Sequence, residues 1–166
     1  FLFVQFNDTH TPLTPYNRAP DDWHLYDQEV RRADDGIKRV VQKLDELEIK
    51  DETLVIITAD HGESLGEREM PYGHGYNVYE ESVNVPLVLS HPNLERRRLT
   101  DGVARIKDIA PTVLDALSAP IPETFTGHSL LKPVADNSKL PEDALTFVSG
   151  KWMIESQIGK EIAQRD

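Results

Sequence analysis

The sequence contains no cysteine. Disulfide bonds and a thiol nucleophile within this chain are therefore excluded, whereas the redox compartment stays open. No apolar run approaches the length of about 20 residues that a membrane-spanning helix needs, and no basic segment precedes an apolar one at the start, as in a signal peptide. We therefore expect neither feature in the printed stretch, although a longer parent protein would have room for either upstream.

Positive charge is also scarce, because 18 Lys and Arg residues stand against 29 Asp and Glu residues, for a formal net charge of -11 at pH 7. Nucleic-acid binding depends on clustered Lys and Arg, so no nucleic-acid partner is expected. The basic run Arg96-Arg97-Arg98 is interpreted as a solvated loop. The remaining composition, 39% hydrophobic in 166 residues, is typical of one domain with a hydrophobic core.

The most informative stretch runs from Thr53 to Glu63 and reads TLVIITADHGE. The aliphatic and β-branched run from Leu54 to Thr58 predicts a strand buried on both faces, as in a parallel sheet covered by helices. Ligand sites of such sheets lie outside the carboxyl ends of the strands. There, Asp60 offers a carboxylate, His61 an imidazole, and Gly62 a sharp turn. We predict half of a divalent metal site; the alternative is a plain turn in which Asp60 caps a following helix.

Other elements surround this strand. Residues 1–7 predict a first strand, and a chain that begins inside a strand suggests a piece of a larger protein. Apolar residues at steps of three and four predict a helix over about 23–48, which would complete a right-handed strand–helix–strand crossover. A third strand is expected over 85–90, and a helix from Asp108, its cap, to Leu117, with Ile109, Val113 and Leu114 also on its buried face.

Two histidines lie in polar segments next to these strands. His10 follows the first predicted strand, and His74 stands between two glycines that would let it turn toward the metal site. His10 could equally be a loop histidine or a turn partner of Asp8, and the segment around His74 a glycine-rich surface turn. Beyond residue 118, prolines interrupt regular structure, and a hairpin is expected over 145–149 and 152–156. We therefore divide the chain into residues 1–135, an α/β domain, and residues 136–166, a small hairpin segment.

The order of these motifs resembles the carboxyl-terminal half of the sulfatases of the alkaline-phosphatase superfamily. The matching segments are NDTHTP at 7–12, TLVIITADHGE at 53–63, GHG at 73–75, YEESVNVPLV at 79–88, DIAPTVL at 108–114 and GHSL at 127–130. The resemblance covers residues 1 to about 131. It implies an α/β sandwich in which helices cover a mainly parallel sheet, with a small antiparallel hairpin at the carboxyl end.

The resemblance also implies roles for single residues. Asp60 and His61 match divalent-metal ligands, and the metal would be calcium. His10 matches a histidine that contacts the sulfate or phosphate oxygens. His74 matches a basic position that contacts the anion or protonates the leaving group. The implied activity is metal-dependent hydrolysis of sulfate esters.

The chain departs from the family pattern in one respect. Sulfatases carry a Cys- or Ser-containing signature, the source of their formylglycine nucleophile, together with metal-binding aspartates, upstream of these motifs. Neither is found here, since Asp21-Asp22 and Asp34-Asp35 are better interpreted as a helix cap and a helix surface. We therefore expect that the chain alone is inactive and that the upstream half of its parent completes the site. An open sheet edge in this piece would favour homo-oligomers.

Two alternatives stay open. Phosphoethanolamine and phosphoglycerol transferases of the same superfamily share the Asp-His-Gly motif and use a Thr nucleophile with zinc or manganese. A phosphodiesterase of that superfamily belongs to the same alternative. A sulfatase-like domain without catalysis would instead serve as a binding or regulatory module. Because related enzymes are commonly exported, a periplasmic or extracellular parent is expected, with a membrane anchor as one possibility.

Overall fold

The structure of the chain is a computed structural model. It describes residues 1–10, 22–69, 73–75, 77–96, 98, 102–136, 138–140, 154–155 and 162–163. The chain divides into two compact units, one made of Phe1–Thr53 with Ser64–Gly73 and the other of Leu54–Glu63 with His74–Asp166. In the described ranges, no helix combines the length and the apolar character that crossing a membrane would require.

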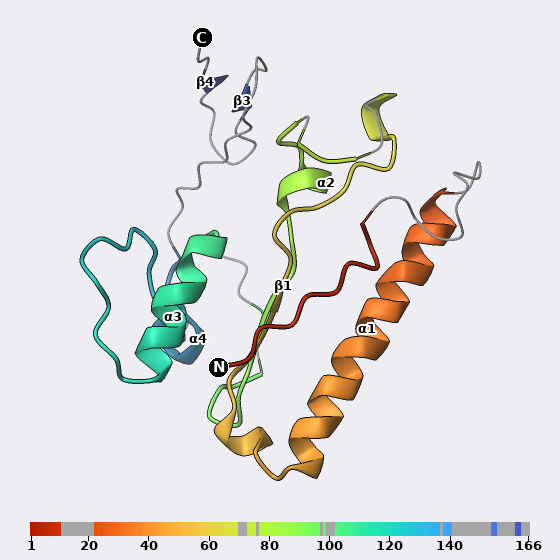
Figure 1. The fold of residues 1–166 in the computed structure, drawn as a ribbon. Coiled ribbons are helices and arrows are strands. Elements are labelled where there is room, and N and C mark those ends of the chain that lie inside the picture. Colours follow the sequence, from red (N-terminus) through yellow and green to blue (C-terminus); the bar gives the residue numbers. More distant parts are fainter. Residues whose placement is uncertain are drawn as a thin grey trace. The chain divides into compact units, whose positions relative to one another are not determined.

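The first unit is built on one long helix, α1 (Asp22–Glu46), which confirms the helix predicted from the apolar periodicity. The 3-10 turn η1 (Lys50–Glu52) follows it. The first residues run alongside α1 (Figure 1), where Phe6 lies against the buried Gly36. A Cβ atom at Gly36 would lie 2.3 Å from Cε1 of Phe6, so only glycine admits this ring at that position. Gly36 therefore allows α1 to pack closely against Phe6.

The strand predicted over residues 1–7 is wrong for this structure. Residues 1–7 have no ladder partner among the described strands, and Phe1, Leu2 and Phe3 are exposed. An extended apolar segment becomes a strand only when a neighbouring strand accepts and donates its backbone hydrogen bonds. The predicted strand–helix–strand crossover over residues 1–59 is therefore not formed either.

The second unit holds the strand that carries the Asp-His-Gly motif. Strand β1 (Val55–Thr58) pairs with β2 (Leu87–Ser90), Val55 opposite Ser90 and Thr58 opposite Leu87. Both strands lie where the aliphatic runs predicted them, and they stand side by side in Figure 1. This pair is antiparallel, as is the pair of β3 (Ile154–Glu155) and β4 (Ile162–Ala163).

The described strands therefore do not show the mainly parallel sheet expected from the sequence. The predicted burial of β1 on both faces is not seen either, since Val55, Ile56 and Ile57 are half-buried and Thr58 is exposed. A continuous aliphatic run favours a strand but carries no information on the direction of the neighbouring strand, which explains the difference in pairing. The antiparallel pairing has a consequence for the site. It brings the end of β1 next to the beginning of β2, and thus next to the short helix α2 (Glu80–Val83) that precedes β2.

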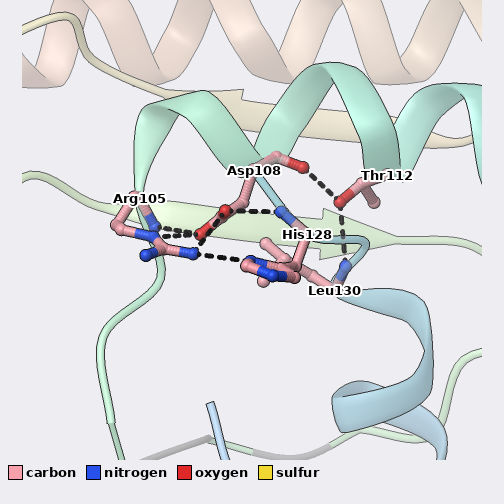
Figure 2. A network of polar contacts seen from close by, with 5 residues as sticks. All are labelled: Arg105, Asp108, Thr112, His128 and Leu130. Carbon is pink, nitrogen blue, oxygen red and sulfur yellow. Dashed lines mark hydrogen bonds and ion pairs between the residues drawn. The ribbon is translucent and has the colours of Figure 1, made fainter. Parts of the chain in front are cut away.

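A buried polar network holds the helical part of the second unit (Figure 2). The turn η3 (Ile106–Asp108) leads into α3 (Ile109–Ala116), and α4 (Leu131–Asp136) packs on α3. The carboxylate of Asp108 accepts hydrogen bonds from the backbone N–H of Arg105 at 2.9 Å, from its guanidinium at 3.0 Å, and from the backbone N–H of His128 at 2.9 Å. These bonds tie residues that are 20 positions apart in the chain.

This network corrects two details of the predicted second helix. Asp108 makes no side-chain capping bond to α3, because its carboxylate is turned back toward Arg105 and His128. The most buried residues of α3 are Pro111 and Thr112, whereas Leu117 is exposed. The Thr112 hydroxyl donates to the carbonyl of Asp108 at 2.5 Å and accepts the backbone N–H of Leu130 at 2.9 Å.

The carboxyl-terminal hairpin differs from its prediction in register. Strand β3 falls within the second predicted arm, 152–156, but it pairs with the downstream β4. The first predicted arm, 145–149, lies outside the described residues. The division into residues 1–135 and 136–166 stays a prediction.

Candidate functional site

The Asp-His-Gly turn at the end of β1 is clamped onto the backbone of α2. The N–H of Gly62 donates to the carbonyl of Ser82 at 2.8 Å. A Cβ atom at position 62 would lie 2.0 Å from the carbonyl oxygen of Glu81, so no side chain fits between the two segments. Gly62 is therefore required for close approach of two backbones. No helix begins at this turn, so the alternative of Asp60 as a helix cap is wrong.

Asp60 and His61 present their side chains together at this turn. The backbone N–H of His61 donates to Oδ1 of Asp60 at 3.0 Å. Nδ1 of His61 lies 2.8 Å from the carbonyl oxygen of Gly62 and must donate to it, since a carbonyl can only accept. Nε2 then faces Asp60, 3.7 Å from Oδ2. The side chain of Asp60 is 82% exposed and that of His61 is 40% exposed, so an ion from solvent can reach both.

This arrangement is the one in which histidines ligate metals. A ligating imidazole typically donates its second ring N–H to a backbone carbonyl or carboxylate, which fixes the ring and its tautomer. The Gly62 carbonyl supplies that partner for His61. In the described part of the chain, no group of three or more Asp, Glu, Cys or His side chains could hold a metal. Asp60 and His61 fit a cation only as two members of a larger set of ligands.

His74 lies against His61. The two ring centroids are 4.0 Å apart, and the rings are tilted by 32°. Nδ1 of His74 is 3.1 Å from Oε2 of Glu63, whose side chain is only 6% exposed, while that of His74 is 32% exposed. Three of the four predicted site residues, Asp60, His61 and His74, are therefore gathered at the end of β1.

Glu63 was not among the predicted site residues. Its signal in the sequence is its place directly after Asp-His-Gly, but the sequence does not say which group the carboxylate meets. Its second oxygen, Oε1, is buried and has no hydrogen-bond partner among the described residues. Glu63 is therefore the buried acid of the site, and Asp60 the exposed one.

The side-chain amide of Asn77 fixes the segment that follows His74. The side-chain oxygen of Asn77 accepts the backbone N–H of Tyr79 at 3.0 Å and the hydroxyl of Ser82 at 2.8 Å. Ser82 is also the residue whose carbonyl accepts the N–H of Gly62. The start of α2 thus connects the turn after β1 with the segment after His74.

The fourth predicted residue, His10, belongs to the first unit. It is exposed, and its backbone N–H donates to the carbonyl of Asn7 at 3.2 Å. Its contact with ester oxygens stays a prediction.

Comparison with known proteins decides the family. A model of the family described as Sulfatase matches residues 1–119. The chain belongs to the sulfatase family. Arylsulfatase K of Canis lupus familiaris is 31% identical over 122 residues, which cover 74% of the chain and 22% of that relative. The chain thus spans about a fifth of the length of this curated sulfatase.

Two solved structures resemble this sulfatase-family chain. Phosphonate monoester hydrolase SpPMH from Silicibacter pomeroyi is 30% identical with a TM-score of 0.57, over 72% of the chain and 22% of that protein. A protein solved in complex with its substrate D-glucosamine-2-N,6-O-disulfate has a TM-score of 0.62 at 24% identity, over 85% of the chain and 29% of its own. The fold is therefore part of the alkaline-phosphatase-like fold that these two proteins share.

Proposed function

We propose that this sulfatase-family chain carries part of the active site of a metal-dependent sulfate-ester hydrolase. The observation that carries the proposal is the gathering of Asp60, His61 and His74 at the end of β1. The upstream part of the parent protein supplies the formylglycine nucleophile and the remaining metal ligands. In the complete protein, the strands described here join a larger and mainly parallel sheet. The chain alone is inactive, because it lacks the nucleophile.

Asp60 and His61 would hold the cation, through a carboxylate oxygen and Nε2. When bound, the cation neutralises negative charge on the ester oxygens and on the nucleophile. Calcium is the cation that the family resemblance implies. Ca²⁺ prefers oxygen ligands, however, and the imidazole of His61 suits zinc better. Competition binding with calcium, zinc and manganese therefore identifies the metal.

His74 serves the leaving group. As the bond between sulfur and the ester oxygen breaks, that oxygen gains negative charge and takes up a proton. Nδ1 of His74 is engaged by Glu63, so the proton would come from Nε2 of the protonated ring, which is left as neutral imidazole with its proton on Nδ1. His10 donates a hydrogen bond to the non-bridging oxygens, where charge also concentrates.

A second candidate function is hydrolysis of phosphonate or phosphate esters. It is favoured by the similarity to the phosphonate monoester hydrolase, which is 30% identical. The residues described above serve either reaction, since both esters present anionic oxygens and an alkoxide leaving group. The nucleophile separates the sulfatase from the transferases, which use Thr.

Mass spectrometry of the full-length parent protein tests the proposal, combined with initial rates on p-nitrophenyl sulfate and p-nitrophenyl phenylphosphonate. A formylglycine upstream of Phe1 and faster hydrolysis of the sulfate support the sulfatase. Faster hydrolysis of the phosphonate supports the second candidate. A Thr nucleophile, or no hydrolysis of either ester, contradicts both hydrolases and leaves a transferase or a binding module. The periplasmic or extracellular location, the possible membrane anchor and the homo-oligomer stay predictions about the parent.

A further inference from the structure

An isolated antiparallel bridge adjoins Glu63 and His74 in the chain. Ser64 and Gly73 form an isolated bridge in which each N–H donates to the other's carbonyl at 3.0 Å. Glu63 precedes Ser64 and His74 follows Gly73, so the two are the next directly opposed pair in that register. Directly opposed residues of antiparallel segments bring their Cβ atoms to about 5 Å. The meeting of these two side chains is therefore set by the backbone.

The carboxylate decides which nitrogen of His74 carries a proton. Oε2 of Glu63 is 3.1 Å from Nδ1 of His74. An ionised carboxylate is only an acceptor, so Nδ1 must donate to it, and the neutral ring is held as the Nδ1–H tautomer. Nε2 is then the nitrogen that exchanges a proton with other groups.

Glu63 is itself held firmly. Its side chain is buried, and its backbone lies between the Gly62 bond to Ser82 on one side and the Ser64–Gly73 bridge on the other. A fixed carboxylate limits the rotation of the imidazole it engages, as in sites where an acid orients a catalytic histidine. His61 lies against the same ring, with a centroid distance of 4.0 Å.

We propose that Glu63 is the positioning residue of His74, which fixes the tautomer and the orientation of the ring so that Nε2 serves the leaving group. Glu63 itself touches no substrate. This inference rests on the proposed function for the role of His74 in the reaction. The effect on the tautomer is independent of that function.

The experiment uses the full-length parent protein labelled with ¹⁵N at histidine. At about two pH units above the ordinary imidazole pKa of about 6.5, ¹⁵N shifts and two-bond couplings distinguish the tautomers. In the wild-type protein we expect the Nδ1–H form of His74, assigned by its loss in His74→Asn. The Nε2–H form in the wild-type protein would overturn the proposal, without any variant of Glu63 having to fold.

Variants extend the test to catalysis. In Glu63→Ala, His74 should no longer be held as the Nδ1–H tautomer. The kcat on p-nitrophenyl sulfate should fall about 10- to 100-fold with KM little changed, the usual cost of losing a supporting partner. Glu63→Gln, whose amide oxygen can still accept from Nδ1, should recover both the tautomer and most of kcat. The matched control is Glu80→Ala, which removes an exposed carboxylate at the start of α2 and should change neither.

The outcomes separate the two hypotheses. If the wild-type protein hydrolyses no ester but the tautomer depends on Glu63, the proposed function fails and the positioning by Glu63 stands. If the wild-type protein is active and Glu63→Ala leaves both the tautomer and kcat unchanged, the positioning fails and the proposed function stands.

Discussion

The imidazole rings of His61 and His74 lie 4.0 Å apart, centroid to centroid, with a tilt of 32°. His61 comes from the end of β1, and His74 from a segment that returns to that end after the Ser64–Gly73 bridge. The candidate metal ligand and the candidate proton donor are therefore neighbours. A change at either position should be judged by metal affinity and by turnover separately.

His61→Asn should shift the metal preference of the parent protein toward calcium. The substitution replaces an imidazole nitrogen by an amide, whose oxygen is a donor that Ca²⁺ accepts readily. We expect the ratio of zinc affinity to calcium affinity to fall about tenfold or more, in line with the 10- to 100-fold effects of even indirect ligand changes. Isothermal titration with each metal measures this ratio, and an unchanged ratio would exclude His61 as a ligand.

Gly62→Ala should destabilise the second unit. The new Cβ atom would lie 2.0 Å from the carbonyl oxygen of Glu81, so the turn or α2 must shift, at a cost of about 1–3 kcal/mol or more. Gly75→Ala is the matched control, because its φ of +81° strains a side chain but no atom lies within 4 Å. Its cost should stay near 1 kcal/mol. Urea unfolding compares the two, and equal losses would contradict the close approach at Gly62.

Acid should remove a part of the stability that depends on Asp108. Burial raises the pKa of this carboxyl, but the hydrogen bonds from Arg105 and from the N–H of His128 outweigh it, so the pKa lies below the ordinary 3.8. A depressed pKa contributes stability that is complete above the unfolded value and is lost as pH falls through the folded one. The free energy of unfolding should therefore decline below about pH 4.

The Asp108→Asn variant should not show this part of the decline of stability with acid. Its free energy of unfolding at neutral pH should be lower by about 3 kcal/mol or more, since the nearly buried Arg105 loses its counter-charge. Asp115→Asn is the control, because Asp115 is exposed and bonds only the Ser129 hydroxyl among the contacts described for it. If the free energy of unfolding depended on pH identically in the wild-type protein and in Asp108→Asn, the loss of stability in acid could not be assigned to Asp108.

Thr112→Val should cost about 1–3 kcal/mol, because it leaves the buried N–H of Leu130 without its acceptor. Thr112→Ser keeps the hydroxyl and should retain most of that stability. At Thr53, where the hydroxyl donates to the carbonyl of Ile49 in an exposed position, the same change to Val should cost little. Similar losses at the two sites would show that the bond between Thr112 and Leu130 contributes nothing specific.

Elements that depend on local pattern were predictable from the sequence. The apolar periodicity located α1, and the aliphatic runs located β1 and β2 to within two residues. The direction of pairing was not predictable, because an aliphatic run carries no information on the direction of its neighbour. Residues 1–7 have the composition of a strand, but a strand also needs a neighbour.

The sequence pointed to three residues that the structure brings together, Asp60, His61 and His74, and their chemical roles stay predictions. Asp60 and His61 were selected because they follow an aliphatic strand, and His74 because of its glycine neighbours and the resemblance to sulfatases. The bond from His74 to Glu63 depends on the bridge between Ser64 and Gly73, a pairing with no periodic signal. The contact between Asp108 and His128 likewise joins residues 20 apart in the chain, which no local pattern encodes.

The most direct test of the account is the initial rate of p-nitrophenyl sulfate hydrolysis by the full-length parent protein carrying Asp60→Ala or His74→Ala. Both variants should fold, as judged by circular dichroism, and lose about 100-fold or more in kcat, the scale of a lost metal ligand or general acid. Asp51→Ala, in the exposed turn η1, should leave the rate unchanged. Folded Asp60→Ala and His74→Ala variants with wild-type rates would contradict the assignment of the active site to the end of β1.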